Sequence, residues 1–218
     1  MKIAKGTLSW IVGSFLLALL SLSFFVFSNI KNSPLSIVFL IITILLFLLT
    51  IFFVMFFRDP DRKIGQGIVA VADGKIRDIT KFEDKDIGFC ICISTFMNVN
   101  NVHVNRMPLN GKVESMQHID GGHIPAFKKE SDRNERVITI IDSKIGKIKV
   151  VQIAGTLARR IVPYIRRIET LKKGEKIGII RLGSRVDVYL PSKKIKKVCV
   201  KVGDKIKAGE DCLAEIYG

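Results

Sequence analysis

The stretch LSIVFLIITILLFLLTIFFVMFF, residues 35–57, decides how this chain is organised. It contains no charged residue, and it is longer than the roughly 20 apolar residues that a helix needs to cross a bilayer. A second uncharged stretch, LSWIVGSFLLALLSLSFFVF at 8–27, precedes it, and the polar segment SNIKNSP separates the two. We therefore predict a transmembrane helical hairpin, with helices over about 8–28 and 35–57.

A cleaved signal peptide is the competing interpretation of the first stretch. No small-residue cleavage site occurs before Lys31, and a second apolar stretch follows at once, which favours the hairpin. Most flanking basic residues lie at the outer ends of the two stretches: Lys2, Lys5, Arg58, Arg62 and Lys63. The positive-inside rule then predicts that both ends, and with them the rest of the chain, lie on the cytoplasmic side of the cell membrane.

Charge is distributed very unevenly along the chain. Of the 218 residues, 35 are Lys or Arg and 20 are Asp or Glu, yet residues 1–57 hold only three of the basic and none of the acidic ones. A basic domain held near an anionic membrane surface gains about 1 kcal/mol per basic residue. We expect such a surface as a partner, and no nucleic acid, because no recognised nucleic-acid motif is present. The pattern excludes a disordered chain, a disulfide scaffold and a purely soluble globule.

Short runs of Val and Ile, broken by Gly, Asp and Asn, fill the sequence from Gly67 onward. They predict strands in GIVAVADGKIRDI (67–79), GFCICISTF (88–96), GKVESM (111–116), ERVITIIDS (135–143), GKIKVVQIA (146–154) and RVDVYLP (185–191). One segment, AGTLARRIVPYI (154–165), has helical spacing that Pro163 interrupts. The predicted fold class is mostly β, a sandwich or barrel with few short helices, preceded by the membrane hairpin. Residues 58–218 are long enough for one sizeable core.

Two features suggest how the strands connect. Asp73-Gly74 and Asn110-Gly111 begin similar segments, and such dipeptides are strong hairpin signals. The C-terminal KKVCVKVGDKIKAGEDCLAEI (196–216) resembles the lipoyl and biotinyl carrier domains, which implies hammerhead elements of short strands. It lacks the lysine, in the form MKM, that such a carrier modifies. A membrane-tethered carrier or adaptor domain without catalysis is nevertheless an alternative function for the chain.

The four cysteines predict no disulfide framework. Cys90 and Cys92 would point to the same side of a strand, and Cys199 and Cys212 are isolated in the sequence, so all four are expected as reduced core residues. No CxxC pair suggests zinc. The histidines of HIDGGH (118–123) could ligate a metal with the Asp between them, but the Gly-Gly favours a loop near a substrate. We predict no metal site.

Five segments have a compatible order and spacing: RDPDRKI (58–64), VADGKI (71–76), FMNVNNVHVNRMPLNGKV (96–113), VQIAGTLARRI (151–161) and RLGSRVDVYLP (181–191). Each is a weak signal alone. Together they resemble the pyruvoyl-dependent phosphatidylserine decarboxylases over nearly all of residues 58–218. The resemblance is closest to the short form of that family, which includes the archaetidylserine decarboxylases.

The resemblance implies an enzyme that decarboxylates a serine phospholipid to its ethanolamine form. Loss of carbon dioxide leaves a carbanion next to nitrogen, so an electron sink must first join the amine. In the family, a covalently bound pyruvoyl group takes this role by forming a Schiff base with that amine. Ether-linked and ester-linked lipids fit equally. A relative that acts on a soluble amino acid is a further alternative, and the two apolar stretches argue against it.

By the same resemblance, the pyruvoyl group is made from Ser184. The proenzyme would cleave itself at Gly183-Ser184 into a β chain of 1–183 and an α chain of 184–218, which stay together as partners. Glycine leaves the attacked carbonyl unshielded and tolerates a strained backbone. A Gly-Ser dipeptide by itself is more often the ordinary start of a strand, but the surrounding RLGSRVDVYLP favours cleavage. A homo-oligomer is compatible with the sequence.

Self-cleavage needs a base for the serine hydroxyl, commonly a histidine oriented by an acid. The resemblance places His103 and Asp73 in these roles. Longer bacterial members carry two histidines separated by two residues, with an acid two residues before the first; the corresponding positions here are Asn101, His103 and Arg106. His103 could therefore serve cleavage, protonation of the carbanion, or both. A structural histidine and a plain turn-forming Asp are the simpler alternatives.

Three arginines, Arg106, Arg159 and Arg160, are candidates for binding the lipid phosphate. The planar guanidinium group suits phosphate oxygens because it donates two parallel hydrogen bonds. A solvated charged face explains the same residues equally well.

Overall fold

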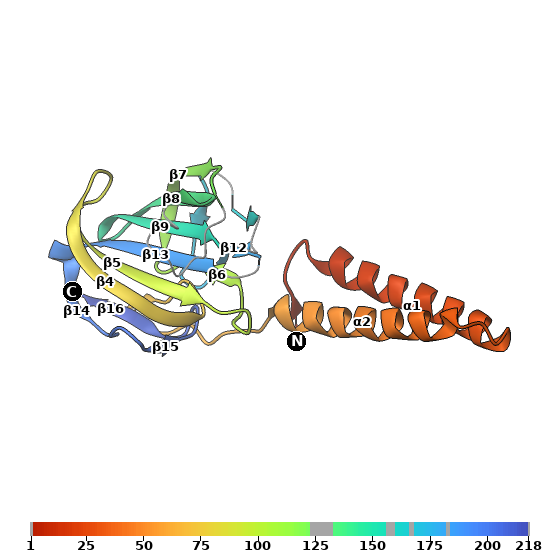
Figure 1. The fold of residues 1–218 in the computed structure, drawn as a ribbon. Coiled ribbons are helices and arrows are strands. Elements are labelled where there is room, and N and C mark those ends of the chain that lie inside the picture. Colours follow the sequence, from red (N-terminus) through yellow and green to blue (C-terminus); the bar gives the residue numbers. More distant parts are fainter. Residues whose placement is uncertain (1, 123–132, 156–159, 166–167, 182–183, 218) are drawn as a thin grey trace. The chain divides into compact units, whose positions relative to one another are not determined.

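The computed structural model describes residues 2–122, 133–155, 160–165, 168–181 and 184–217. The chain forms two compact units, Met1–Pro60 and Asp61–Gly218. Figure 1 shows an α-helical pair in the first unit and a β domain in the second. The predicted fold class, a mostly β domain preceded by a pair of apolar helices, is confirmed.

The first unit is a helical hairpin. Helices α1 (Leu8–Ile30) and α2 (Leu35–Phe56) are both long and apolar enough to cross a membrane. Few of their side chains are buried inside the protein, so most of their apolar surface is available to lipid, which suggests membrane association. At the open end of the hairpin, β1 (Lys2–Ile3) pairs antiparallel with β2 (Arg58–Asp59).

Small polar residues form the contact face between the two helices. In α1 the buried residues Ser14, Ser21 and Ser28 recur every seven positions, and in α2 Thr43 and Thr50 do the same. The Thr43 hydroxyl donates to Ser21 Oγ and the Thr50 hydroxyl to Ser14 Oγ, both at 2.9 Å. Small residues let apolar helices approach closely, and hydroxyl groups join them. The sequence reasoning considered only the length of these stretches and missed this spacing.

Where the structure describes the second unit, it contains three antiparallel sheets. An eight-stranded, curled sheet has the order β11-β7-β8-β9-β13-β5-β4-β15, and two smaller sheets have the orders β10-β12-β6 and β14-β16-β3 (Figure 1). The bounds are β3 (Ile68–Val69), β4 (Gly74–Asp84), β5 (Gly88–Met97), β6 (Val104–Arg106), β7 (Gly111–Ile119), β8 (Arg136–Ser143), β9 (Gly146–Ala154), β10 (Ile161–Pro163), β11 (Thr170–Leu171), β12 (Lys176–Ile180), β13 (Ser184–Pro191), β14 (Ile195–Val198), β15 (Lys205–Ile206) and β16 (Cys212–Ile216). A short 3₁₀ helix, η2 (Ser192–Lys194), follows β13.

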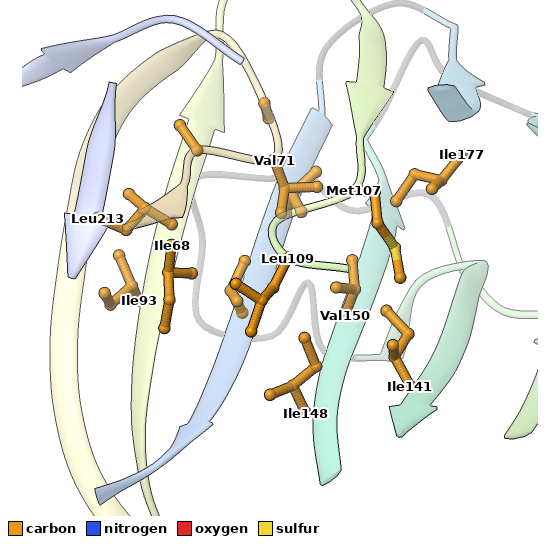
Figure 2. Close-up of a cluster of buried hydrophobic side chains, with 14 of the residues drawn as sticks. Ile68, Val71, Ile93, Met107, Leu109, Ile141, Ile148, Val150, Ile177 and Leu213 are labelled. Carbon is orange, nitrogen blue, oxygen red and sulfur yellow. The ribbon is translucent and has the colours of Figure 1, made fainter. Parts of the chain in front are cut away.

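One hydrophobic core joins the three sheets. Figure 2 shows side chains from all three sheets in this core. Ile93 and Ile148 come from the large sheet, Ile177 from β12, Ile68 from β3 and Leu213 from β16. These side chains are almost fully buried. Strand β13 lies near the centre of the large sheet, between β9 and β5, so a residue at its start is held by ladder partners on both sides.

The two Asx-Gly dipeptides do not form hairpin turns, contrary to prediction. Strand β4 starts at Gly74 and β7 at Gly111, but neither is paired with the strand before it. A Cβ atom at Gly74 would lie 2.2 Å from the Phe96 carbonyl oxygen, and one at Gly111 would lie 2.6 Å from that of Asp142. These glycines therefore permit close approach of a neighbouring strand. An Asx-Gly dipeptide is typical of a turn, but close approach of a neighbouring strand also requires glycine, so the sequence pattern is the same in both cases.

The segment 154–165 is not a helix where the structure describes it. Residues 156–159 lie outside the described residues, and Ile161–Pro163 form strand β10, which pairs with β12. Strand β10 is at the edge of its sheet, where a proline without an N–H group is tolerated. Pairing with β12 thus overrode the helical spacing.

The cysteines differ from the expectation of four isolated core residues. Cys90 and Cys92 are buried on β5, as expected. Cys199 is exposed and Cys212 half-buried, and their Sγ atoms lie 3.5 Å apart. Thirteen residues separate the two cysteines in the sequence, and the pairing of Cys199 with Leu213 through a backbone hydrogen bond brings them together.

Candidate active site

Ser184, the proposed pyruvoyl precursor, is the first residue of β13. It pairs with Met97 of β5 on one side and with Ala154 of β9 on the other. Its side chain is completely buried, and among the described residues its Oγ has no hydrogen-bond partner. Gly183, the other half of the predicted cleavage site, lies outside the described residues. A buried hydroxyl without a partner is costly, so such a position suggests a functional group.

His103 is also fully buried, and it immediately precedes β6. Its Nδ1 lies 2.9 Å from the Asn101 carbonyl oxygen. A carbonyl only accepts, so Nδ1 carries the proton in this hydrogen bond, which leaves Nε2 as the ring nitrogen that would exchange a proton in catalysis. The His103 carbonyl accepts the N–H of Ile180 at 3.3 Å, four residues before Ser184.

Asp73 lies beside the residue that precedes His103. Its carboxylate accepts the N–H of Ala208 at 2.8 Å and a double hydrogen bond from Arg62, and the N–H of Val102 also contributes. Burial raises the pKa of the Asp73 carboxyl above its ordinary value, and these donors only partly oppose the shift. The structure therefore brings the predicted acid and the predicted base into one neighbourhood, with the Asn101 carbonyl holding the imidazole ring.

Further buried polar side chains surround Ser184, and sequence reasoning missed them. Asn134 donates from Nδ2 to the carbonyl of Ala154 at 2.7 Å, and so supports the ladder partner of Ser184. Gln152 donates from Nε2 to Asn105 Oδ1 at 2.7 Å. A single Gln in the apolar run VVQIA was the available signal, because a polar residue at a core position of a strand needs a partner.

The three candidate arginines occupy different environments. Arg106 is buried, and its Nη1 donates to the Gly174 carbonyl at 3.1 Å; phosphate binding by this residue stays a prediction. Arg159 lies outside the described residues, and Arg160 is exposed. Arg181, which the sequence reasoning did not single out, donates its N–H to the Arg160 carbonyl. Burial, and then the charge of Arg160, lower the pKa of Arg181, so the two guanidinium groups repel each other electrostatically.

Among the described residues, no group of three or more His, Cys, Asp and Glu side chains could hold a metal ion. His118 lies with Nε2 2.9 Å from Glu135 Oε1, and the same carboxylate oxygen accepts the N–H of Ile161. The second histidine of the HIDGGH segment, His123, lies outside the described residues.

The family model described as phosphatidylserine decarboxylase matches residues 49–214. The chain therefore belongs to the phosphatidylserine decarboxylase family.

Individual relatives cover most of the chain. A protein of Methanococcoides burtonii, provisionally named archaetidylserine decarboxylase proenzyme, is 44% identical over 98% of this chain and 96% of its own length, so the similarity includes both apolar helices. The phosphatidylserine decarboxylase proenzyme of Streptomyces avermitilis is 49% identical over 71% of this chain and 69% of its own length. A second archaetidylserine relative, from Methanosarcina barkeri, is 46% identical over 77% of this chain and 79% of its own length.

Proposed function

We propose that this protein is a membrane-anchored decarboxylase of serine phospholipids that matures by cutting its own chain before Ser184. The observation that carries the proposal is the buried Ser184 hydroxyl, which has no hydrogen-bond partner among the described residues. Strand β12 ends four residues before it, at Ile180, whose N–H donates to the carbonyl of buried His103. Family membership and relatives named as decarboxylase proenzymes support the proposal. The carrier alternative depends only on the resemblance of residues 196–216, a segment that lacks the lysine that such a carrier modifies.

Maturation would proceed in steps that balance. Ser184 Oγ attacks the carbonyl carbon before it, its proton passes to a base, and the peptide C–N bond breaks as the nitrogen takes a proton. The resulting ester loses its acyl group by elimination, in which the Cα proton of Ser184 is removed and the Cβ–O bond breaks. Water then replaces the nitrogen, which leaves as ammonia, and a pyruvoyl group remains at the start of the α chain. His103 is the proposed base, with Asp73 as the acid of the site.

A pyruvoyl group made from Ser184 would lie at the first residue of β13, where the serine is completely buried. It would supply a ketone for the substrate amine and an electron sink for the loss of carbon dioxide. His103 would hold or release a proton at Nε2 during that loss. Arg160 and Arg181 are proposed to bind the phosphate of the head group, because two close guanidinium groups favour an anion.

The two apolar helices support an anchor in the cell membrane, and the basic flanking residues support a cytoplasmic β domain. A lipid head group reacts at the bilayer surface. Tethering a catalytic domain there raises the effective concentration of its substrate. This effect would explain why an enzyme of this kind carries two apolar helices.

The intact mass of the purified protein, compared with that of a Ser184→Ala variant, tests the proposal. We expect the wild type to split into two chains, with the small one about 17 Da lighter than a chain that begins with serine, because a ketone replaces the amine. The variant should stay whole. A folded wild type that remains a single chain contradicts the proposal.

Lipid vesicles then test the substrate class. Processed protein should release carbon dioxide from serine lipids in a bilayer and none from free serine. Parallel vesicles with ether-linked isoprenoid and ester-linked fatty-acid serine lipids distinguish the two lipid types that the relatives' names suggest. Equal release from free serine would contradict a lipid substrate.

A further inference from the structure

Two buried amide side chains connect the strand that carries His103 to the sheet that carries Ser184. Asn105 of β6 is completely buried, and Gln152 of β9 almost completely. Gln152 Nε2 donates to Asn105 Oδ1 at 2.7 Å. Strands β6 and β9 belong to different sheets, so this hydrogen bond joins the two sheets at the level of the candidate site.

The bond from Gln152 determines which way the Asn105 amide faces. Because Oδ1 accepts from Gln152, the NH₂ group points to the other side, where Nδ2 lies 3.8 Å from Met97 Sδ. A thioether sulfur is a weak acceptor, so a strong buried donor has only a weak partner there among the contacts described. Met97 is the cross-strand partner of Ser184, which places the donor next to the residue that Ser184 faces across the ladder.

All of these side chains lie on one face of the large sheet. Gln152 is the ladder partner of Val186, and Val186 and Ser184 are two residues apart on β13, so they share a face. Met97 shares that face as the ladder partner of Ser184. Gln152 and Met97 thus flank the Asn105 amide on the core side of the sheet, at the end where Ser184 begins β13.

We propose that Asn105 is the hydrogen-bond donor that stabilises the oxyanion formed during self-cleavage, and that Gln152 is the positioning residue that orients it. This inference rests on the proposed function. When Ser184 Oγ bonds to the preceding carbonyl carbon, the carbonyl π pair moves onto oxygen, and the hydroxyl proton passes to His103. The Asn105 NH₂ group donates to that oxygen until the pair returns, the C–N bond breaks, and the nitrogen takes the proton from His103.

An oxyanion donor acts through charge that exists only in the transition state and the intermediate that follows. Removing one such donor typically lowers the rate by about 10²–10³-fold. A buried amide in an otherwise apolar strand also has a cost unless it is fully hydrogen-bonded. Asn105 is therefore a costly choice for packing alone, and its orientation by Gln152 matches what a preorganised donor requires.

The test measures the first-order rate of self-cleavage of full-length precursor made by cell-free synthesis in lipid nanodiscs, followed by gel and intact mass. Asn105→Asp keeps the shape and still accepts from Gln152, but an ionised carboxylate cannot donate. We expect cleavage about 10²-fold slower than in the wild type near neutral pH. The ratio of wild-type to variant rate should fall as the pH is lowered, because a protonated Asp regains an O–H donor. Thermal unfolding of the same variant over the same pH range separates this effect from a pH-dependent loss of fold caused by the buried carboxylate.

Gln152→Glu tests the positioning role. An ionised Glu accepts rather than donates, so the Asn105 amide should turn its NH₂ group toward residue 152 and away from Ser184, and cleavage should slow although Asn105 is intact. Gln117→Glu makes the same substitution at an exposed position of β7 and should cleave at the wild-type rate. Thermal unfolding of each precursor, built on a Ser184→Ala background to prevent cleavage, identifies variants that fail to fold.

Each outcome has a separate meaning. If the wild type cleaves and a folded Asn105→Asp variant cleaves equally fast, the role of Asn105 is overturned, whereas the proposed function stands. A slow variant whose ratio to the wild type does not change with pH overturns the donor role of Asn105. An unchanged Gln152→Glu variant overturns the positioning role. A wild type that stays whole overturns the proposed function, and the inference with it.

Discussion

Arg62 holds the carboxylate of Asp73 through a double hydrogen bond, from Nη2 to Oδ1 at 3.0 Å and to Oδ2 at 2.8 Å. The side chains are about 7% and 10% exposed, so the ion pair is largely removed from water. Ala208 donates to the same carboxylate from 135 residues further along the chain. The acid of the candidate site is thus fixed by a cation from the N-terminal edge of the β domain and by a backbone N–H of its C-terminal part.

Arg62→Ala is expected to destabilise the β domain by about 3–5 kcal/mol, because it leaves a buried carboxylate without its cation. The loss raises the pKa of Asp73 further above its ordinary value, so the destabilisation should shrink as the pH falls and Asp73 becomes neutral. Chemical denaturation of the full chain in detergent micelles measures both effects. Lys63→Ala removes the neighbouring exposed charge and should change little; equal losses in the two variants would contradict this account.

A second buried ion pair predicts acid sensitivity. Asp84 accepts from Lys149, whose ammonium group also lies 4.5 Å from the centroid of the Tyr189 ring. Burial acts to raise the pKa of Asp84, but Lys149 and the N–H groups of Asp86 and Ile87 outweigh it and lower the pKa overall. A lowered folded-state pKa contributes stability that is present above the unfolded value, near 3.8, and is lost as the pH falls below it.

Asp84→Asn should therefore cost about 2–3 kcal/mol of unfolding free energy at neutral pH, and its difference from the wild type should narrow below pH 4 or so. Urea unfolding at a series of pH values measures this. Glu114→Gln is the matched control, because the Lys147–Glu114 pair is about half exposed and exposed pairs contribute little. A constant difference between Asp84→Asn and the wild type at all pH values would exclude the proposed linkage.

The hydroxyl contacts of the helical hairpin predict a graded effect of substitution. Thr50→Val removes one interhelical hydrogen bond and should weaken the hairpin by about 0.6 kcal/mol, whereas Ser14→Leu adds bulk at a buried contact and should separate the helices. Ser23→Ala is the control, because Ser23 is exposed and bonds only within its own helix.

Trp10, the single tryptophan, packs edge-on against Phe53 of the other helix, with ring centroids 5.8 Å apart. Its fluorescence in mixed micelles with increasing dodecyl sulfate reports separation; identical curves for Ser14→Leu and Ser23→Ala would refute the packing.

Three of the four thiols should react with maleimide in a defined order. Burial raises the pKa of Cys92 to about 12, and burial together with the adjacent Cys199 raises that of Cys212 to about 11. Because the thiolate is the reactive form, exposed Cys199 should label first, Cys212 later, and Cys92 only after unfolding. Peptide mass spectrometry after timed labelling at neutral pH measures the order. Early labelling of Cys92 in the folded protein would be inconsistent with its position on β5.

The sequence predicted individual strands well, but it predicted only some of the residues that lie near the candidate site. The short runs of Val and Ile in GKIKVVQIA and RVDVYLP predicted β9 and β13 closely, because β-branched residues bounded by turn-forming residues are typical of strands. The turn reading of Asp73-Gly74 was wrong, because a glycine that lets Phe96 approach leaves the same local pattern as a turn. Arg181 and Asn105 were missed, because one lies in the same segment as the more prominent Gly183-Ser184 and the other beside the more prominent His103.

The sequence by itself determined the apolar hairpin, the mostly β domain and the family, because hydrophobic length, strand periodicity and motif order are properties of neighbouring residues. The tertiary structure decided which of these residues meet. Asp73 with Arg62 and Ala208, Asn105 with Gln152, and Cys199 with Cys212 come together only because particular strands and loops pack against one another. A strand's pattern specifies which face is buried, but many partners satisfy that pattern equally, and only the packing of the whole core selects one.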